Sequence, residues 1–109
     1  DPDMFGLFGY SYLLANKDKI KATAVNGVKP SLKGIQDYSY PIARPLFFYV
    51  KKAHIGVVPG IHEYLKEFTA KKATGSKGYL TDIGLVPLSS DKYKITRTSA
   101  LKLATIKIN

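Results

Sequence analysis

The sequence contains no cysteine among its 109 residues. Structural disulfides and thiolate metal sites are therefore excluded, and so is redox chemistry that depends on thiols. The longest uninterrupted apolar run, at 45–50, has the size of a strand, whereas a membrane helix needs about 20 apolar residues. The sequence therefore predicts no segment that spans a bilayer.

Metal-site and catalytic motifs are also missing. His54 and His62 are the two histidines, and neither has a histidine or cysteine partner at ligand spacing. There is no Gly-x-Ser-x-Gly elbow for a nucleophile. Glu63 and Glu67 lie one helical turn apart, which fits the flanks of a packed helical stripe better than a pair of catalytic carboxylates. We therefore predict a protein that is not an enzyme and uses no metal ion or organic cofactor.

Arginine is scarce, yet the chain is strongly basic. It carries 17 Lys and Arg residues against 8 Asp and Glu residues, a formal net charge of +9, and its arginines are Arg44 and Arg97. Such a charge favours an anionic partner, whether nucleic acid, a membrane surface or a small oxyanion. Because groove readers and bidentate phosphate clamps favour the planar fork of Arg, we interpret most of the charge as a solvated lysine surface.

Apolar patterning in the first half of the chain predicts short strands alternating with short helices. We expect a buried strand at 4–10, a short helix at 10–16, a half-buried strand at 19–25 and a strand covered on both faces at 46–50. Asn26-Gly27 is a turn signal, and Ser31 is a candidate N-cap for a short, weak helix. The prolines of residues 40–45 predict an extended crossing.

The second half predicts two longer helices. Ile61, Tyr64, Leu65 and Phe68 recur at helical spacing after Pro59-Gly60, and Gly75 is a good stop. Residues 76–84 are a turn-rich connection, and 85–88 form a short extended piece whose proline indicates an edge or a strand end. Residues 89–91 are a strong N-cap signal for a last helix from about residue 91, although 101–107 also fit a period of two.

Four segments together resemble the phosphate-specific solute-binding proteins of ABC importers. They are GLFGYSY at 6–12, VNGVKPS at 25–31, YPIARPLFFYVKK at 40–52 and GLVPL at 84–88. The resemblance runs the length of the chain, and the segment at 40–52 carries most of it. It implies an α/β fold: the C-terminal part of a two-lobed periplasmic-binding-protein fold of type II, with mixed sheets flanked by helices.

The resemblance also implies a domain organisation and a function. Residues 1–40 would finish the second lobe, residues 41–45 would form the interlobe crossing or hinge, and residues 46–109 would be the C-terminal part of the first lobe. The parent protein would capture inorganic phosphate in the periplasm or at the extracellular face of a bacterial membrane and deliver it to the membrane subunits of an ABC importer, an ion-transport role. The first residues, Asp1-Pro2-Asp3, lack the features of an export signal, so we expect such a signal to lie upstream or to have been removed.

Few residues of this chain are candidates for the phosphate site. In the family the phosphate is held mainly by hydroxyls, helix N-terminal amides, an Arg and an Asp from upstream motifs that this sequence lacks. Gly9, Tyr10 and Ser11 could line the edge of the cleft, because helix N-termini bind oxyanions. Pro41, Arg44 and Pro45 are the hinge candidates, and Arg44 would either pair with a carboxylate across the hinge or bond nearby carbonyls.

Two alternatives remain open at the level of sequence. The chain could be a basic nucleic-acid-binding module with aromatics interleaved among lysines. We do not expect nucleic acid as a partner, because the aromatics at 47–49, 64 and 68 fall in segments predicted to be buried. The chain could also be a structural fragment without function of its own that self-associates by strand exchange.

Overall fold

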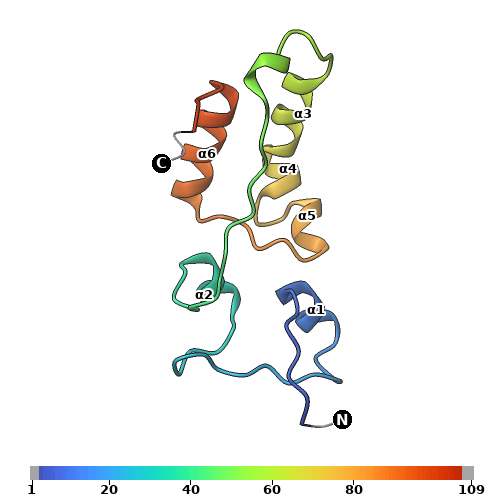
Figure 1. Cartoon of the computed structure of the whole chain (residues 1–109), viewed down its shortest axis with the longest axis vertical. Helices are drawn as coiled ribbons and strands as arrows, with labels where there is room; N and C mark the ends of the chain where they lie inside the picture. Colours follow the sequence, from blue (N-terminus) through green and yellow to red (C-terminus); the bar gives the residue numbers. More distant parts are fainter. Residues whose placement is uncertain (1–2, 107–109) are drawn as a thin grey trace.

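In a computed structural model that describes residues 3–106, helices are the regular elements. They are α1 (Tyr10–Ala15), α2 (Leu32–Gln36), the 3-10 helix η1 (Lys52–His54), α3 (Ile61–Phe68), α4 (Lys71–Thr74), α5 (Tyr79–Asp82) and α6 (Ser90–Leu101). Figure 1 shows α3–α6 grouped at one end of the molecule and α1 and α2 at the other. An extended segment, residues 43–50, runs from one group to the other.

The predicted fold class, an α/β part of a two-lobed binding protein with mixed sheets, is wrong for the described residues. Residues 3–106 contain no β-strand, and their bridge pairing is limited to the isolated pairs Val25–Val28 and Ile55–Val58. Of the segments predicted as strands, 4–9, 20–24 and 46–50 have no regular structure, Tyr10 begins α1, Lys19 lies in a turn and Val25 forms an isolated bridge. Alternating or continuous apolar residues suit a strand, but a strand is stabilised by cross-strand pairs, and no segment here supplies them.

Helices α3–α6 form the best-packed part of the chain. The predicted stripe on α3 is confirmed in part: Leu65 is buried, Ile61 and Phe68 are half-buried, and Tyr64 is exposed. Helix α3 contacts both α4 and α6, and α4 contacts α5. Ala73 of α4 has no exposed surface, so the core lies where these short helices meet.

The long helix expected from Pro59-Gly60 to Gly75 is divided in two. Helix α3 ends at Phe68, α4 begins at Lys71, and Gly75 is the C-cap of α4. The hydroxyl of Thr69 donates to the carbonyl of Leu65 at 2.7 Å, a local bond by which threonine competes with helical backbone bonding. The last helix begins at Ser90 as predicted, with Ser89 as its N-cap residue.

In the first part of the chain, the turn and cap signals are confirmed. Asn26 and Gly27 have φ values of 50° and 78°, and the amides and carbonyls of Val25 and Val28 bond each other at 2.9 and 3.0 Å. Positive φ at both central residues is what a tight two-residue turn requires. The Ser31 hydroxyl accepts a bond from the Gly34 amide at 3.0 Å and so caps α2.

The molecule is elongated, with extents of 53 × 30 × 26 Å. Its radius of gyration is 16.9 Å, against about 13 Å for a compact domain of this length. Within residues 3–106, Leu65, Ala73 and Pro87 are the buried residues with an apolar side chain. Most large apolar side chains are therefore left at the surface.

Candidate functional site

Gly9, Tyr10 and Ser11 form the N-terminal end of α1. Gly9 is the N-cap, and its carbonyl accepts from the amides of Tyr12 at 3.0 Å and Leu13 at 3.3 Å. The first amides of a helix have no acceptor within the helix. Because α1 has six residues, its end attracts an anion less than the end of a long helix does.

Ser11 packs against the backbone of Gly84. Gly84 has a φ of +106°, and a Cβ added there would clash with the Cβ of Ser11. Glycine is therefore needed at 84 both for the backbone conformation and for the close approach of α1. Two of the segments that carry the family resemblance, 6–12 and 84–88, thus lie together in the structure.

A second contact joins α2 to the same segment. The side-chain amide of Gln36 donates to the carbonyl of Pro87 at 2.8 Å. The ammonium group of Lys92, near the start of α6, lies 4.3 Å from the centre of the Tyr38 ring, within the range of a cation–π interaction. Residues 84–92 therefore connect the group of α1 and α2 with the group of α3–α6.

Pro41, Arg44 and Pro45 lie where the chain leaves the α2 region. The Ala43 amide donates to the Tyr40 carbonyl at 3.0 Å, which closes a turn, and the chain is extended from there to residue 50. Arg44 is exposed. Within residues 3–106 the recorded ion pair joins Lys72 to Glu67, and Arg44 takes part in neither that pair nor a recorded side-chain hydrogen bond. The hinge role of these residues stays a prediction.

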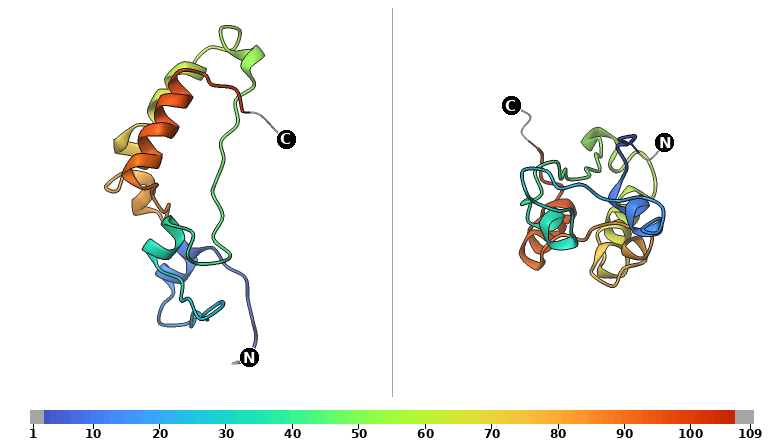
Figure 2. Two further views of the ribbon diagram at one scale, coloured as in Figure 1. Left: turned by 90° about the vertical axis from the view of Figure 1, so that its left-hand side faces the viewer. Right: turned by 90° about the horizontal axis from the view of Figure 1, so that it is seen from below.

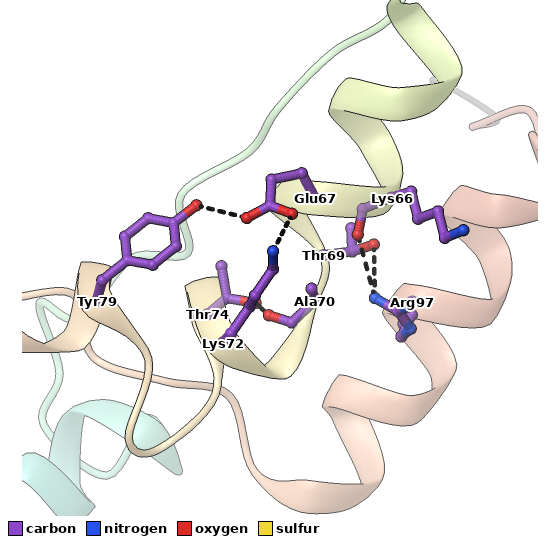
Figure 3. A network of polar contacts seen from close by, with 8 residues as sticks. All are labelled: Lys66, Glu67, Thr69, Ala70, Lys72, Thr74, Tyr79 and Arg97. Carbon is purple, nitrogen blue, oxygen red and sulfur yellow. Dashed lines mark hydrogen bonds and ion pairs between the residues drawn. The ribbon is translucent and has the colours of Figure 1, made fainter.

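The polar contacts in Figure 3 hold helices together. Glu67 accepts from Lys72 at 2.8 Å and from the Tyr79 hydroxyl at 3.3 Å. The hydrogen bond from Lys72 lowers the pKa of the Glu67 carboxyl, and the same bond raises the pKa of Lys72. Partial desolvation, followed by the charge of Glu67, raises the pKa of Tyr79.

Arg97 of α6 also holds helices together. It is half-buried, and its guanidinium donates to the Thr69 hydroxyl at 3.3 Å and to the Lys66 carbonyl at 3.4 Å. The Tyr93 hydroxyl donates to the Thr69 carbonyl at 2.8 Å. These contacts fasten α6 to the end of α3, so Arg97 is engaged in packing. Nothing in the sequence signalled this, because the partners are about 30 positions apart.

A shallow depression of about 390 Å³ lies beside α3. Phe48, Tyr64, Lys51 and His54 are among the residues that line it, and the Phe48 ring lies 5.2 Å from that of Tyr64 and 5.1 Å from that of Phe68. No group of three or more metal-ligating side chains occurs in the described part of the chain. The depression is therefore mainly aromatic and apolar, with two basic side chains.

The expectation that the aromatic run is buried is wrong. Phe47, Phe48, Tyr49 and Tyr64 are all exposed. A continuous apolar run is buried only when other elements cover it. Here the ring contacts with α3 involve Phe48 and leave Phe47 and Tyr49 uncovered. The sequence argument against a stacking surface for nucleic acid therefore loses its structural basis.

Comparison with known proteins shows a similarity to bacterial phosphate-binding proteins. The chain is 33% identical over 94 residues to the phosphate-binding protein PstS of Staphylococcus aureus strain USA300 and to that of Staphylococcus haemolyticus strain JCSC1435. It is 31% identical over 93 residues to that of Staphylococcus saprophyticus. These matches cover 82%, 82% and 81% of this chain.

The chain spans about 28% of the length of these curated relatives. No protein-family model and no solved structure matches it. The predicted resemblance to phosphate-specific binding proteins is thus supported as a sequence similarity, while its assignment to their C-terminal portion stays a prediction. Among the described helices, none has both the length and the apolar character needed to cross a membrane.

Proposed function

We propose that this chain is part of a protein that binds inorganic phosphate outside the cytoplasm and delivers it to the membrane subunits of an ABC importer. The observation that carries this proposal is the 33% identity to proteins named as phosphate-binding, over 82% of the chain. The relatives are binding proteins by name, which accords with a protein that is not an enzyme. A net charge of +9 raises the local concentration of an oxyanion.

In this proposal the chain forms structural parts of both lobes, and it supplies few of the residues that contact the phosphate. Residues 1–40 complete one lobe, 41–45 cross between lobes, and 46–109 belong to the other lobe. The extended run at 43–50 between two groups of helices supports this division. The main phosphate ligands lie in the part of the protein outside the match, and Gly9, Tyr10 and Ser11 lie at the edge of the site.

Calorimetric titration with inorganic phosphate tests the proposal. The full-length protein that carries this sequence is expected to bind phosphate with one site per chain, and the 109-residue chain alone is expected to give no saturable heat. A full-length protein that binds no phosphate would refute the function. Tight binding by the short chain alone would refute the placement of the ligands elsewhere.

Arg44 allows a sharper test of the crossing. In the full-length protein, Arg44→Ala is expected to change the phosphate Kd several-fold, because Arg44 would bias the open and closed states without touching the ligand. The matched control is Lys94→Ala, which removes one exposed charge from α6. Identical titrations for wild type and Arg44→Ala would eliminate the hinge role.

A nucleic-acid-binding module is the second candidate, since Phe47 and Tyr49 are exposed next to Lys51 and Lys52. Exposed aromatics beside cations can stack bases and contact phosphates. A salt series with single-stranded DNA separates the two functions. Tight DNA binding that weakens steeply with salt would favour this candidate. We expect the protein to bind single-stranded DNA only weakly.

A further inference from the structure

Tyr38 has an unusual backbone conformation. Its φ is +62°, in the left-handed region that favours glycine over a bulky side chain. Tyr38 directly follows Asp37, the C-cap of α2, and a left-handed residue at this place is a common way to end a helix. The Asp37 carboxylate accepts from the Ser39 amide at 2.9 Å, and the Gly34 carbonyl accepts from the Tyr40 amide at 2.9 Å. The helix end explains the conformation, but it does not explain why the residue is a tyrosine.

The side chain of Tyr38 gives a reason for the tyrosine. The ammonium group of Lys92 lies 4.3 Å from the centre of its ring, and cation–π attraction acts within about 6 Å. A glycine at position 38 would adopt the left-handed conformation more readily, but it would offer no ring to Lys92. The contact therefore ties the end of α2 to the start of α6.

This contact spans the proposed crossing between the lobes. Tyr38 precedes residues 41–45 and Lys92 follows them, so in the proposed division the two residues belong to different lobes. In the left view of Figure 2, the extended segment that follows the crossing runs along one side of the molecule, and the chain that enters α6 lies toward the other side. The contact is therefore set off from the crossing, and a rotation about 41–45 would displace its two partners relative to each other.

A small displacement is enough to break the contacts at this place. The cation–π attraction fades beyond about 6 Å from the ring centre, so a shift of about 2 Å removes it. The nearby bond from Gln36 to the Pro87 carbonyl is 2.8 Å long, and a hydrogen bond is lost beyond about 3.5 Å. Both contacts therefore belong to the arrangement that the structure shows.

The arrangement in the structure is closed at the edge of the proposed site. Residues 9–11 lie at that edge in the proposed function, and Ser11 packs so closely on Gly84 that an added Cβ would clash with it. Gly84 belongs to the other lobe in the proposed division. Two-lobed binding proteins close around their ligands by hinge motion, so lobes in contact at the cleft edge correspond to the state that holds the ligand.

We propose that Tyr38 and Lys92 form a latch that stabilises the closed arrangement of the lobes and so strengthens phosphate binding. The proposal rests on the proposed function, because it requires two lobes and a phosphate site. A contact made in one of two states shifts the equilibrium toward that state. The apparent Kd falls as the fraction of protein in the binding-competent state rises. Tyr38 and Lys92 are therefore positioning residues, which act on the site through the lobes.

Phosphate titration of variants tests the latch in the full-length protein that carries this sequence. Lys92→Met removes the cation but keeps most of the side-chain length, and it is expected to raise the Kd about two- to fivefold, the contribution of an exposed cation–π contact. Lys94→Met is the control, because Lys94 is exposed on the same helix, and its Kd is expected to equal that of wild type. An unchanged or lower Kd for Lys92→Met would overturn the proposal.

Variants of Tyr38 separate the ring from its hydroxyl and from the backbone. Tyr38→Phe keeps the ring and is expected to keep the wild-type Kd, whereas Tyr38→Leu is expected to raise the Kd as much as Lys92→Met does. Leucine and phenylalanine both lack the freedom of glycine at positive φ, so the two variants are matched in backbone cost. A Kd for Tyr38→Phe as high as that for Tyr38→Leu would contradict the latch.

The double variant Tyr38→Leu/Lys92→Met decides whether the two residues act together. Its Kd is expected to equal that of either single variant, because each substitution removes the same contact. Multiplied effects would show that the residues act separately and would refute the latch.

The outcome can be separated from that of the proposed function. A wild-type full-length protein that binds no phosphate would refute the function. Phosphate binding with the same Kd in wild type, Lys92→Met and Tyr38→Leu would refute the latch and keep the function.

Discussion

Residues 52–101 and residues 3–42 fold in different ways. In the later region α3 contacts α4 and α6, and Leu65 and Ala73 are buried. In the earlier region α1 and α2 are not among the helix pairs in contact, and Gly34 is the residue classed as buried between positions 3 and 42. Helices joined by short loops supply one another's packing partners within a few tens of residues, whereas segments with strand patterns need partners that this chain does not provide.

The two regions are joined by a small set of contacts around residues 84–92. Ser11 packs against Gly84, and Gln36 donates to the Pro87 carbonyl. Because Pro87 is buried, its carbonyl depends on this donor more than an exposed one would. The comparison therefore predicts that mutations in the later region affect its own stability, and that mutations at 84–92 affect the coupling of the regions.

The largest effect is expected from Leu65→Ala. Removing a buried leucine side chain costs about 2–5 kcal/mol through lost burial and a residual cavity. Leu7→Ala is the control, because Leu7 is 90% exposed and its truncation should leave the free energy of unfolding within about 0.5 kcal/mol of wild type. Urea unfolding followed by far-UV circular dichroism measures both. Similar losses for the two variants would erase the contrast between the regions.

A smaller effect is expected from Gly84→Ala, which adds a side chain where the two regions meet. The positive φ and the clash with Ser11 together are expected to cost about 1–3 kcal/mol. Gly27→Ala isolates the backbone part, because Gly27 also has positive φ but no atom within 4 Å of an added Cβ.

Hydrogen exchange of the α1 amides distinguishes the clash with Ser11 from the backbone cost of the positive φ. Gly84→Ala should speed their exchange, and adding Ser11→Gly should restore part of the protection. Equal exchange of α1 in the Gly84→Ala and Gly27→Ala variants would mean that Ser11 and Gly84 do not couple the regions.

The sequence predicted local features well and long-range ones poorly. The Asn26-Gly27 turn, the Ser31 cap and the α3 stripe are encoded within a few residues; the turn and the cap occur in the structure, and the stripe occurs in part, because Tyr64 is exposed. The predicted strands failed because apolar alternation does not specify a pairing partner. Segment 46–50 has the apolar pattern of a strand covered on both faces, yet most of it is exposed. Burial of a segment depends on other segments that pack on it, and the local pattern does not specify them.

The candidate site shows the same division. The segments at 6–12 and 84–88 were identified by resemblance, and the structure places Ser11 against Gly84. The contacts of Arg97 with Thr69 and of Gln36 with Pro87 could not be predicted, because they join positions 28 and 51 apart in sequence. No local pattern marks such pairs.

Gln36→Met tests the second contact between the regions. It keeps the length of the side chain but removes the donor to the Pro87 carbonyl, which is expected to cost about 0.5–1.5 kcal/mol. Lys33→Met, on the same helix but exposed, controls for the added methionine. Urea unfolding measures both variants, and a loss in Lys33→Met equal to that in Gln36→Met would show that the bond to Pro87 contributes nothing.

The smallest effect is expected at the exposed Glu67–Lys72 pair within the later region. Because the hydrogen bond from Lys72 lowers the pKa of Glu67, its contribution is complete above the ordinary carboxyl range, near pH 4.5, and is lost as pH falls through the lowered pKa. Wild type should therefore exceed Glu67→Gln in Tm by a small, constant amount from pH 6 to 8, and the difference should vanish in acid. Glu63→Gln, on the same helix but outside the ion pair, is the control for replacing a carboxylate of α3 by an amide. Because the pair is exposed, salt should shrink the difference at neutral pH, and a difference that grew toward acid pH would reverse the assigned sign.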